Sequence, residues 1–153
     1  MSEIITLSGW VAVAGSRRGS PWSPAPVLAL VRAAGGRVRV GDAAGVDAAV
    51  RALCPDARVL SARAFPGPPR AALARRTRAV VLGPPPADLL LVFPPAGGAP
   101  ALGPGSSLAL RLALEAGLPA WVAGEPRPPG ALWRPLALAG VPGWVHPPRP
   151  RLL

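Results

Sequence analysis

Five short apolar runs, separated by four segments with helical spacing, leave this chain few possible folds. The strongest run is ADLLLVFP at 87–94, which is apolar almost throughout and too short for an ordinary helix. Such a run is typical of a strand buried on both faces of a parallel sheet. Strands that alternate with helices predict βαβ units. The pattern therefore predicts an α/β fold, a Rossmann-like doubly wound parallel sheet of about five strands.

The expected elements follow one another with short connections. We expect strands at 10–15, 37–41, 57–62, 87–94 and 119–124, and helices at 23–36, 45–54, 68–83 and 106–116. Prolines at the beginning and glycines after the end mark the first and third of these helices. Together these elements predict a Rossmann-like nucleotide-binding domain over residues 1–124.

Residues 125–153 break the alternation, because they are dense in proline. We expect this proline-rich C-terminal tail to pack on the domain and to add edge strands near 133–138 and 142–146. Trp133 and Trp144 favour packing, since large apolar rings are costly to leave in water. The same tryptophans could instead lie at a homodimer interface, so the sequence leaves the oligomeric state open.

Composition argues against several classes of protein. No apolar run is long enough to span a bilayer, and the first residues lack the basic and apolar regions of a signal peptide. Cys54 is the only cysteine and His146 the only histidine, which argues against a disulfide or a metal site. We expect a cytoplasmic protein with no membrane, metal or cofactor beyond a possible nucleotide ligand. Without paired carboxylates or a Ser–His pair, we expect no catalytic residues, and binding is favoured over catalysis.

The net charge of +10 comes entirely from arginine, because the chain has no lysine. A GC-rich genome would produce this bias without selection for function. Guanidinium groups also bind phosphate and stack on bases, so a polyanionic partner would explain the same excess. Composition does not choose between these explanations.

Three loops after expected strands are rich in glycine, serine or arginine, at 14–20, 41–47 and 94–107. In an open parallel sheet, ligands lie beyond the carboxyl ends of the strands, where the winding reverses. In the first loop, Gly15 lets the backbone approach a ligand, Ser16 offers a hydroxyl and Arg17 a bidentate cation. This loop predicts a phosphate contact.

The stretch GPGSSLALRLALEAG at 103–117 opens the fourth expected helix. Gly103 and Gly105 allow a concave array of amides, and Ser106 and Ser107 lie where a helix leaves its first N–H groups unpaired. The positive end of the helix dipole would then face a bound anion. Alternatively Ser106 only caps its helix. The coincidence of three such loops at one sheet edge favours the anion site.

The loop GDAAGVD contains two candidate acids. Gly41 and Gly45 bracket a tight turn, and Asp47 lies in the first turn of the second helix. Asp47 could complement the helix dipole, order the loop or accept a ribose hydroxyl. Asp42 directly follows the strand, so we expect it to be the better placed of the two for a ligand.

The third expected helix carries four arginines. Arg70, at the N-terminus of this helix, is expected to face phosphate. Arg75 and Arg78 lie on roughly one face of the helix, and Arg76 is expected to point away from that face. A solvated helix face is the ordinary explanation for such residues. If the partner is nucleic acid, Arg17, Arg70 and Arg75 are the candidates for contact.

Several motifs together resemble the SLOG superfamily, which joins the DNA-processing A (Smf) proteins and the Lonely Guy phosphoribohydrolases. They are VAVAGSRRG, VGDAAGVDAAV, ALARRTRAVV and ADLLLVFPPAGG with GPGSSLALRLALEAGLPAWV. The similarity covers about residues 10–123 and is closest to the short, stand-alone members. It implies a nucleotide or nucleic-acid phosphate at Gly15–Arg17, Gly41–Asp47 and Gly103–Ser107.

The chain departs from this pattern at one functional position. The phosphoribohydrolases carry a PGGxGT loop followed by a catalytic glutamate, whereas here the next acid is Glu115, more than two turns into the helix. Cleavage of an N-glycosidic bond needs a carboxylate near the sugar. Three hypotheses remain: a nucleotide-binding or sensing protein, a single-stranded DNA or RNA binder like DNA-processing A, or a nucleotide N-glycosidase using Asp42 or Asp47. The first is the one that the sequence favours.

Overall fold

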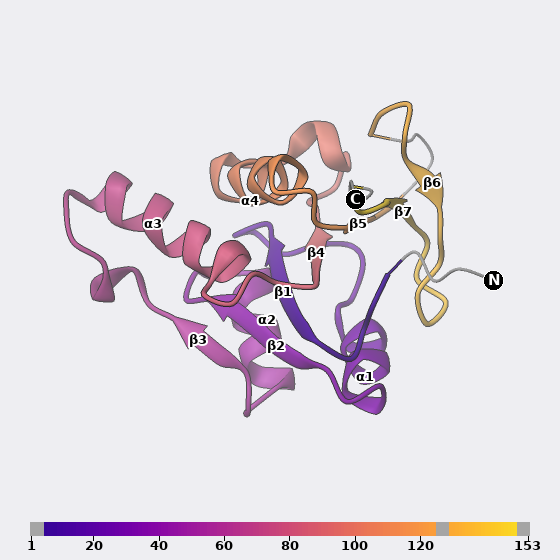
Figure 1. Cartoon of the computed structure of the whole chain (residues 1–153), viewed down its shortest axis with the longest axis horizontal. Helices are drawn as coiled ribbons and strands as arrows, with labels where there is room; N and C mark the ends of the chain where they lie inside the picture. The colour runs from indigo at the N-terminus through magenta and orange to yellow at the C-terminus, as the bar shows by residue number, and fades with distance from the viewer. Residues whose placement is uncertain (1–4, 125–128, 150–153) are drawn as a thin grey trace, which may run out of the picture.

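The protein is an α/β fold of three layers, seen in a computed structural model that describes residues 5–124 and 129–149 (Figure 1). A seven-stranded, mostly parallel sheet has the order β3-β2-β1-β4-β5-β7-β6, which confirms the predicted Rossmann-like fold class. The strands are β1 (Trp10–Gly15), β2 (Arg37–Gly41), β3 (Arg58–Leu60), β4 (Leu89–Phe93), β5 (Ala120–Ala123), β6 (Arg134–Pro135) and β7 (Gly143–His146). The helices are α1 (Ala25–Ala33), α2 (Val46–Leu53), α3 (Pro69–Leu82) and α4 (Pro104–Glu115), with short 3-10 turns at Ala62–Ala64 and Ala99–Ala101.

Alternation along the strands divides the core between the two faces of the sheet. Leu89, Leu91 and Phe93 of β4 pack with α1 and α2. Leu90 and Val92, which point the other way, pack with α3 and α4. Every residue of β4 is buried, as its continuous apolar sequence predicts.

The winding of the sheet reverses next to β1. This strand pairs in parallel with β2 on one side and with β4 on the other. The chain runs outward from β1 to β3 and then returns to place β4 on the opposite side of β1. The carboxyl ends of these strands therefore border the crevice where ligands of open α/β sheets bind.

A buried arginine ties β2 to the end of α3. The side chain of Arg39 is almost fully buried, and its guanidinium donates to the carbonyl oxygens of Val80 (2.6 Å), Pro85 (2.8 Å) and Val81 (3.3 Å). Burial, with the nearby charge of Arg58, lowers the pKa of this guanidinium. Carbonyls at a helix C-terminus lack intrahelical donors, so Arg39 supplies them and holds α3 against the sheet.

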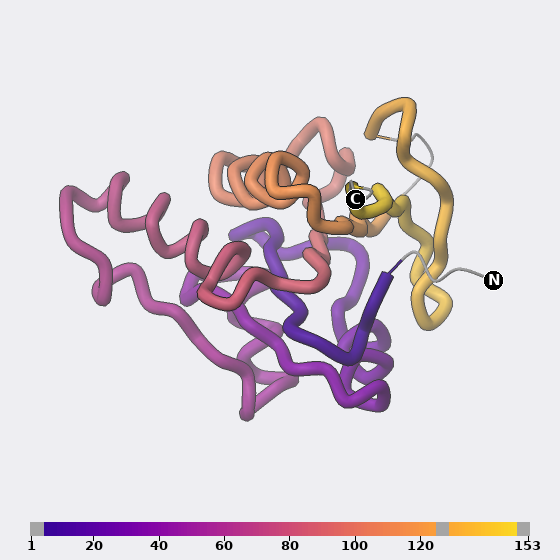
Figure 2. The backbone as a smooth tube through the Cα atoms, in the orientation of Figure 1, coloured from indigo at the N-terminus to yellow at the C-terminus, as the bar shows by residue number. Residues whose placement is uncertain are grey.

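The C-terminal segment continues the sheet beyond β5. Strand β7 pairs antiparallel with β5, and β6 pairs antiparallel with β7. Trp121 of β5 donates its indole N–H to the Leu136 carbonyl at 2.7 Å, and the Trp133 ring meets His146 edge-on at 5.3 Å. This segment lies at the opposite side of the molecule from α3 (Figure 2). Within the described ranges, no helix is long and apolar enough to cross a membrane.

Candidate functional site

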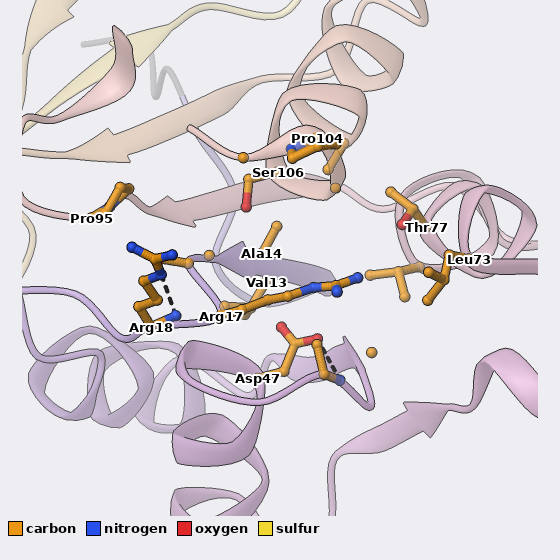
Figure 3. A pocket seen from close by; sticks show the side chains of 18 of the residues that line it. Val13, Ala14, Arg17, Arg18, Asp47, Leu73, Thr77, Pro95, Pro104 and Ser106 are labelled. Atoms are coloured by element: carbon orange, nitrogen blue, oxygen red, sulfur yellow. Dashed lines mark hydrogen bonds between the residues drawn. The ribbon is translucent and has the colours of Figure 1, made fainter. Parts of the chain in front are cut away.

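A cleft of about 690 Å³ opens at the carboxyl ends of the central strands, between α3 and α4 (Figure 3). Its walls come from residues 13–18, the end of β2, one face of α3, the loop after β4 and the first turn of α4. This volume is in the ordinary range for sites that hold small organic ligands. The cleft lies at the reversal of the winding, beside β1.

The fold gathers most of the sequence candidates in this cleft. Those that line it are Gly15, Ser16, Arg17, Gly41, Asp47, Arg70, Gly103, Gly105 and Ser106. Those outside its lining are Asp42, Gly45, Ser107 and Arg75. All three loops singled out in the sequence therefore contribute to one concave surface.

The first turn of α4 presents unpaired amides to the cleft. Gly103 is the N-cap residue, no side chain caps the helix, and the first amide with a backbone partner is that of Ser107, which donates to Gly103 at 2.9 Å. Pro104 has no N–H, and the amides of Gly105 and Ser106, which precede the first intrahelical bond, have no hydrogen-bond partner among residues 5–124 and 129–149. Ser106 is buried and is not the cap that the alternative interpretation proposed.

Two glycines of the predicted site serve the packing of loops on each other. A Cβ at Gly15 would lie 2.6 Å from the side chain of Val46. Gly45 has a φ of +71°, and a Cβ there would lie 2.3 Å from the Ser16 carbonyl oxygen, which accepts from the Val46 amide at 3.0 Å. The Ser16 hydroxyl accepts from the Arg18 amide at 3.1 Å, within its own loop. The first loop is thus fixed against the beginning of α2.

Asp42 in the loop after β2 and Asp47 in the first turn of α2 lie in the reverse of the order in which the sequence ranked them for a ligand. Asp42, expected to be the better placed for a ligand, lies outside the cleft lining and pairs with Arg76 at 2.7 Å. Partial burial raises the pKa of Asp42, but hydrogen bonds from Arg76, Ser61 and the Ala62 amide outweigh burial, so the pKa falls below its ordinary value. The loop turns Asp42 toward α3 and leaves the other carboxylate to the cleft.

Asp47 is buried and lines the cleft. Burial raises its pKa, although the Ala43 amide, which donates to it at 3.2 Å, and the charges of Arg76 and Arg51 act in the opposite direction. A carboxyl group in this position can accept from a ligand hydroxyl or amino group when ionised, or donate when protonated.

Arg76 is the residue that sequence reasoning missed. It points away from the exposed face that carries Arg75 and Arg78, as expected, but no role was assigned to it. Its side chain is only 8% exposed and lines the cleft, with Nη1 bonded to Asp42. Its buried Nε has no hydrogen-bond partner among the described residues. Gly41 makes room for it, since a Cβ there would lie 2.9 Å from the Arg76 Cζ. The signal was present: Ala72, Arg76 and Val80 are spaced by four, on the buried face of α3.

Exposed arginines stand at the mouth of the cleft. Arg17, Arg18 and Arg70 line it and are exposed. In Figure 3, Arg17 reaches across the opening between Ser106 and Asp47, and Arg18 extends toward Pro95. Arg75 lies outside the lining and donates to the Pro66 carbonyl. Asp47 is the one acidic residue in the lining formed by the described residues, so the cleft is strongly cationic and suits an anion.

Among the described residues, no group of three His, Cys, Asp or Glu side chains could hold a metal ion. The chain matches no protein-family model, no curated protein and no solved structure. The chemistry of the cleft therefore carries the functional inference.

Proposed function

We propose that this protein binds a nucleotide or nucleotide-derived ligand and holds a phosphate of it at the N-terminus of α4. One observation carries the proposal: the uncapped amides of α4 and the unpartnered Nε of buried Arg76 belong to walls of one cleft. Buried polar groups in native proteins nearly always have a hydrogen-bond partner, so a donor without one indicates a missing acceptor. A phosphate supplies several acceptor oxygens and a charge that suits both a guanidinium and a helix N-terminus.

The rest of the lining supports an organic group attached to this phosphate. Val13, Leu73, Val80 and Ala109 give the cleft apolar surface of the kind that covers a base or sugar. Asp47 adds an acceptor suited to a sugar hydroxyl or an exocyclic amino group. These features, with the SLOG-like motifs, favour a nucleotide over inorganic phosphate. We include in the proposal that the chain is a short SLOG member acting in the cytoplasm.

The alternative functions find less support in the same geometry. Arg17 and Arg70 lie at the cleft mouth, but Arg75 is bonded to the Pro66 carbonyl outside it, so the three do not form one track for a nucleic-acid strand. Glycoside-cleaving enzymes generally use a pair of carboxylates, and Asp47 is the one acid of the described lining. Binding without catalysis is the function that these residues favour.

Isothermal titration calorimetry with a panel of nucleoside mono-, di- and triphosphates and cyclic dinucleotides tests the proposal. We expect saturable binding to part of this panel, lost in Ser106→Asp because its carboxylate would occupy the place of the phosphate. Ser107→Asp is the matched control: it adds the same charge to the same turn, but Ser107 lies outside the lining. Silence across the panel from a folded sample, or equal losses in both variants, would contradict the proposal.

A further inference from the structure

Hydrogen-bond donors suited to an anion line the cleft in two groups, one centred on buried residues and one on exposed residues. The inner group consists of buried Arg76 and buried Ser106, together with the neighbouring amide of Gly105, which is exposed. The outer group is made of exposed guanidiniums from two separate segments. It consists of Arg17 and Arg18 from the loop after β1 and Arg70 from the first turn of α3. The opening is thus flanked by positive charge on both sides.

The inner group is enough for one phosphate. Two amides, the Ser106 hydroxyl and the Arg76 Nε together offer donors for the oxygens of a single phosphoryl group. Ser106 is buried and its hydroxyl has no partner in the described part of the chain, so it is available to the same group. A nucleoside monophosphate would leave the outer arginines without a partner.

The guanidiniums of the outer group make no polar contact within the described part of the chain. No hydrogen bond or ion pair joins the guanidiniums of Arg17, Arg18 or Arg70 to another residue that the structure describes. Other arginines differ: Arg51 donates to the carbonyls of Gly41 and Ala43, both at 3.0 Å. Three like charges at one opening repel one another, which an anion bound between them would relieve.

We infer that the ligand carries a chain of two or more phosphates, as in a nucleoside di- or triphosphate. The phosphate nearest the sugar lies on the α4 amides and Arg76, and the following phosphate lies at the cleft opening, against the exposed guanidiniums of Arg17 and Arg70. This inference rests on the proposed function and narrows its ligand class. A strand of nucleic acid is less suited to the outer group, because consecutive phosphates of a strand are separated by whole sugars, whereas those of a di- or triphosphate are adjacent.

The inference is tested by calorimetric titration with AMP, ADP and ATP at one fixed, low salt concentration. We expect the affinity to rise about tenfold or more from AMP to ADP, which corresponds to about 1.4 kcal/mol. In the double variant Arg17→Ala/Arg70→Ala most of this gain is lost, whereas the affinity for AMP changes little. The control is Arg78→Ala, since Arg78 is exposed on α3 but outside the cleft lining. Removing it alters the net charge without touching the outer group.

The outcomes separate this inference from the proposed function. Equal affinity for AMP and ADP, or an equal loss in Arg78→Ala, overturns the inference and leaves nucleotide binding standing. Silence for all three nucleotides overturns both. Inorganic triphosphate that binds as tightly as ATP supports the phosphate chain but removes the nucleotide from the proposed function. An oligonucleotide that binds more tightly than ATP, with affinity falling steeply as salt rises, assigns the outer arginines to a strand and overturns the inference.

Discussion

The two walls of the cleft both depend on glycine, but for opposite reasons. On the wall formed by the first loop and the beginning of α2, a Cβ at Gly15 or Gly45 would collide with neighbouring atoms. On the α4 wall, a Cβ at Gly103 or Gly105 would meet nothing within 4 Å. The first pair is required by the packing of the chain on itself. The second pair is not required by packing, and under the proposed function it keeps space for the ligand.

The largest expected effect comes from Gly45→Ala. Its φ of +71° disfavours any side chain, and the added Cβ would lie 2.3 Å from the Ser16 carbonyl oxygen. This neighbour is backbone and is held by a hydrogen bond from Val46, so it cannot move away easily. We expect the free energy of unfolding to fall by about 3 kcal/mol or more, measured by urea denaturation. A loss below about 1 kcal/mol would show that the first loop moves to accommodate a Cβ at position 45, which contradicts the steric argument.

Gly15→Ala is expected to have a smaller effect on the same wall. Its φ is not in the left-handed region, but the new Cβ would lie 2.6 Å from atoms of the Val46 side chain. Overpacking of this kind costs about 1–3 kcal/mol. The double variant Gly15→Ala/Val46→Ala removes the two clashing methyl groups and keeps the Val46 Cβ. We therefore expect its loss of stability to be smaller than the sum of the two single losses. Strict additivity in this double-mutant cycle would contradict the steric explanation.

Asp47 of the cleft wall and Asp42 outside it predict opposite dependences on pH. The pKa of Asp47 is raised, so the folded chain binds its proton more tightly and its contribution to stability falls as pH rises from about 3.9 to the raised value. The pKa of Asp42 is lowered, so its contribution is present above the ordinary value and is lost as pH falls through the folded pKa. Thermal denaturation between about pH 3 and 8 measures both.

Relative to the parent chain, Asp47→Asn should therefore become more stable as pH rises from the ordinary aspartate pKa to the raised pKa of Asp47. Asp42→Asn should become less stable than the parent chain as pH rises from the lowered pKa of Asp42 to the ordinary value. Asn keeps an oxygen that can accept from the Ala43 amide, so this variant tests the charge and not the hydrogen bond. If the stability of both variants relative to the parent chain changes in the same direction with pH, the explanation is contradicted. That explanation assigns a pKa raised by burial to Asp47 and a pKa lowered by pairing to Asp42.

The sheet and the edge that holds the cleft could be predicted because they follow from periodicity. Continuous apolar runs such as 87–94 identify buried strands, and the alternation with helices determines that their carboxyl ends share one edge. Glycine and serine after those strands then mark the loops at that edge. None of these inferences requires knowing where a particular side chain points.

The part that the sequence did not predict is which charged side chains line the cleft. Asp42 and Asp47 were ranked by distance from the strand, but the turn at Gly45 and the pairing with Arg76 decide which one lies in the cleft. Arg76 was correctly expected to point away from Arg75 and Arg78, but its spacing from Ala72 and Val80, which placed it on the buried face, was not used. Charged side chains are usually exposed, so an arginine in a row of buried residues departs from that pattern. Positions that depart from such patterns are where functional residues are expected.

The smallest expected change in stability, Gly105→Ala, tests the α4 wall. Gly105 has a backbone conformation that alanine adopts without strain, and open space surrounds its Cβ position, so we expect the unliganded chain to gain about 0.5–1 kcal/mol. Gly105 lines the cleft, so the added methyl takes up space at its wall, and we expect weaker binding of ADP although the amide is retained. Ser107→Ala, in the same turn but outside the lining, should leave binding unchanged. Paired urea denaturation and calorimetry measure both quantities.

A variant that loses stability would mean that Gly105 serves packing, as Gly15 and Gly45 do, and that the two walls do not differ. A variant that gains stability and loses affinity is the result expected where a chain gives up stability to keep a binding site open.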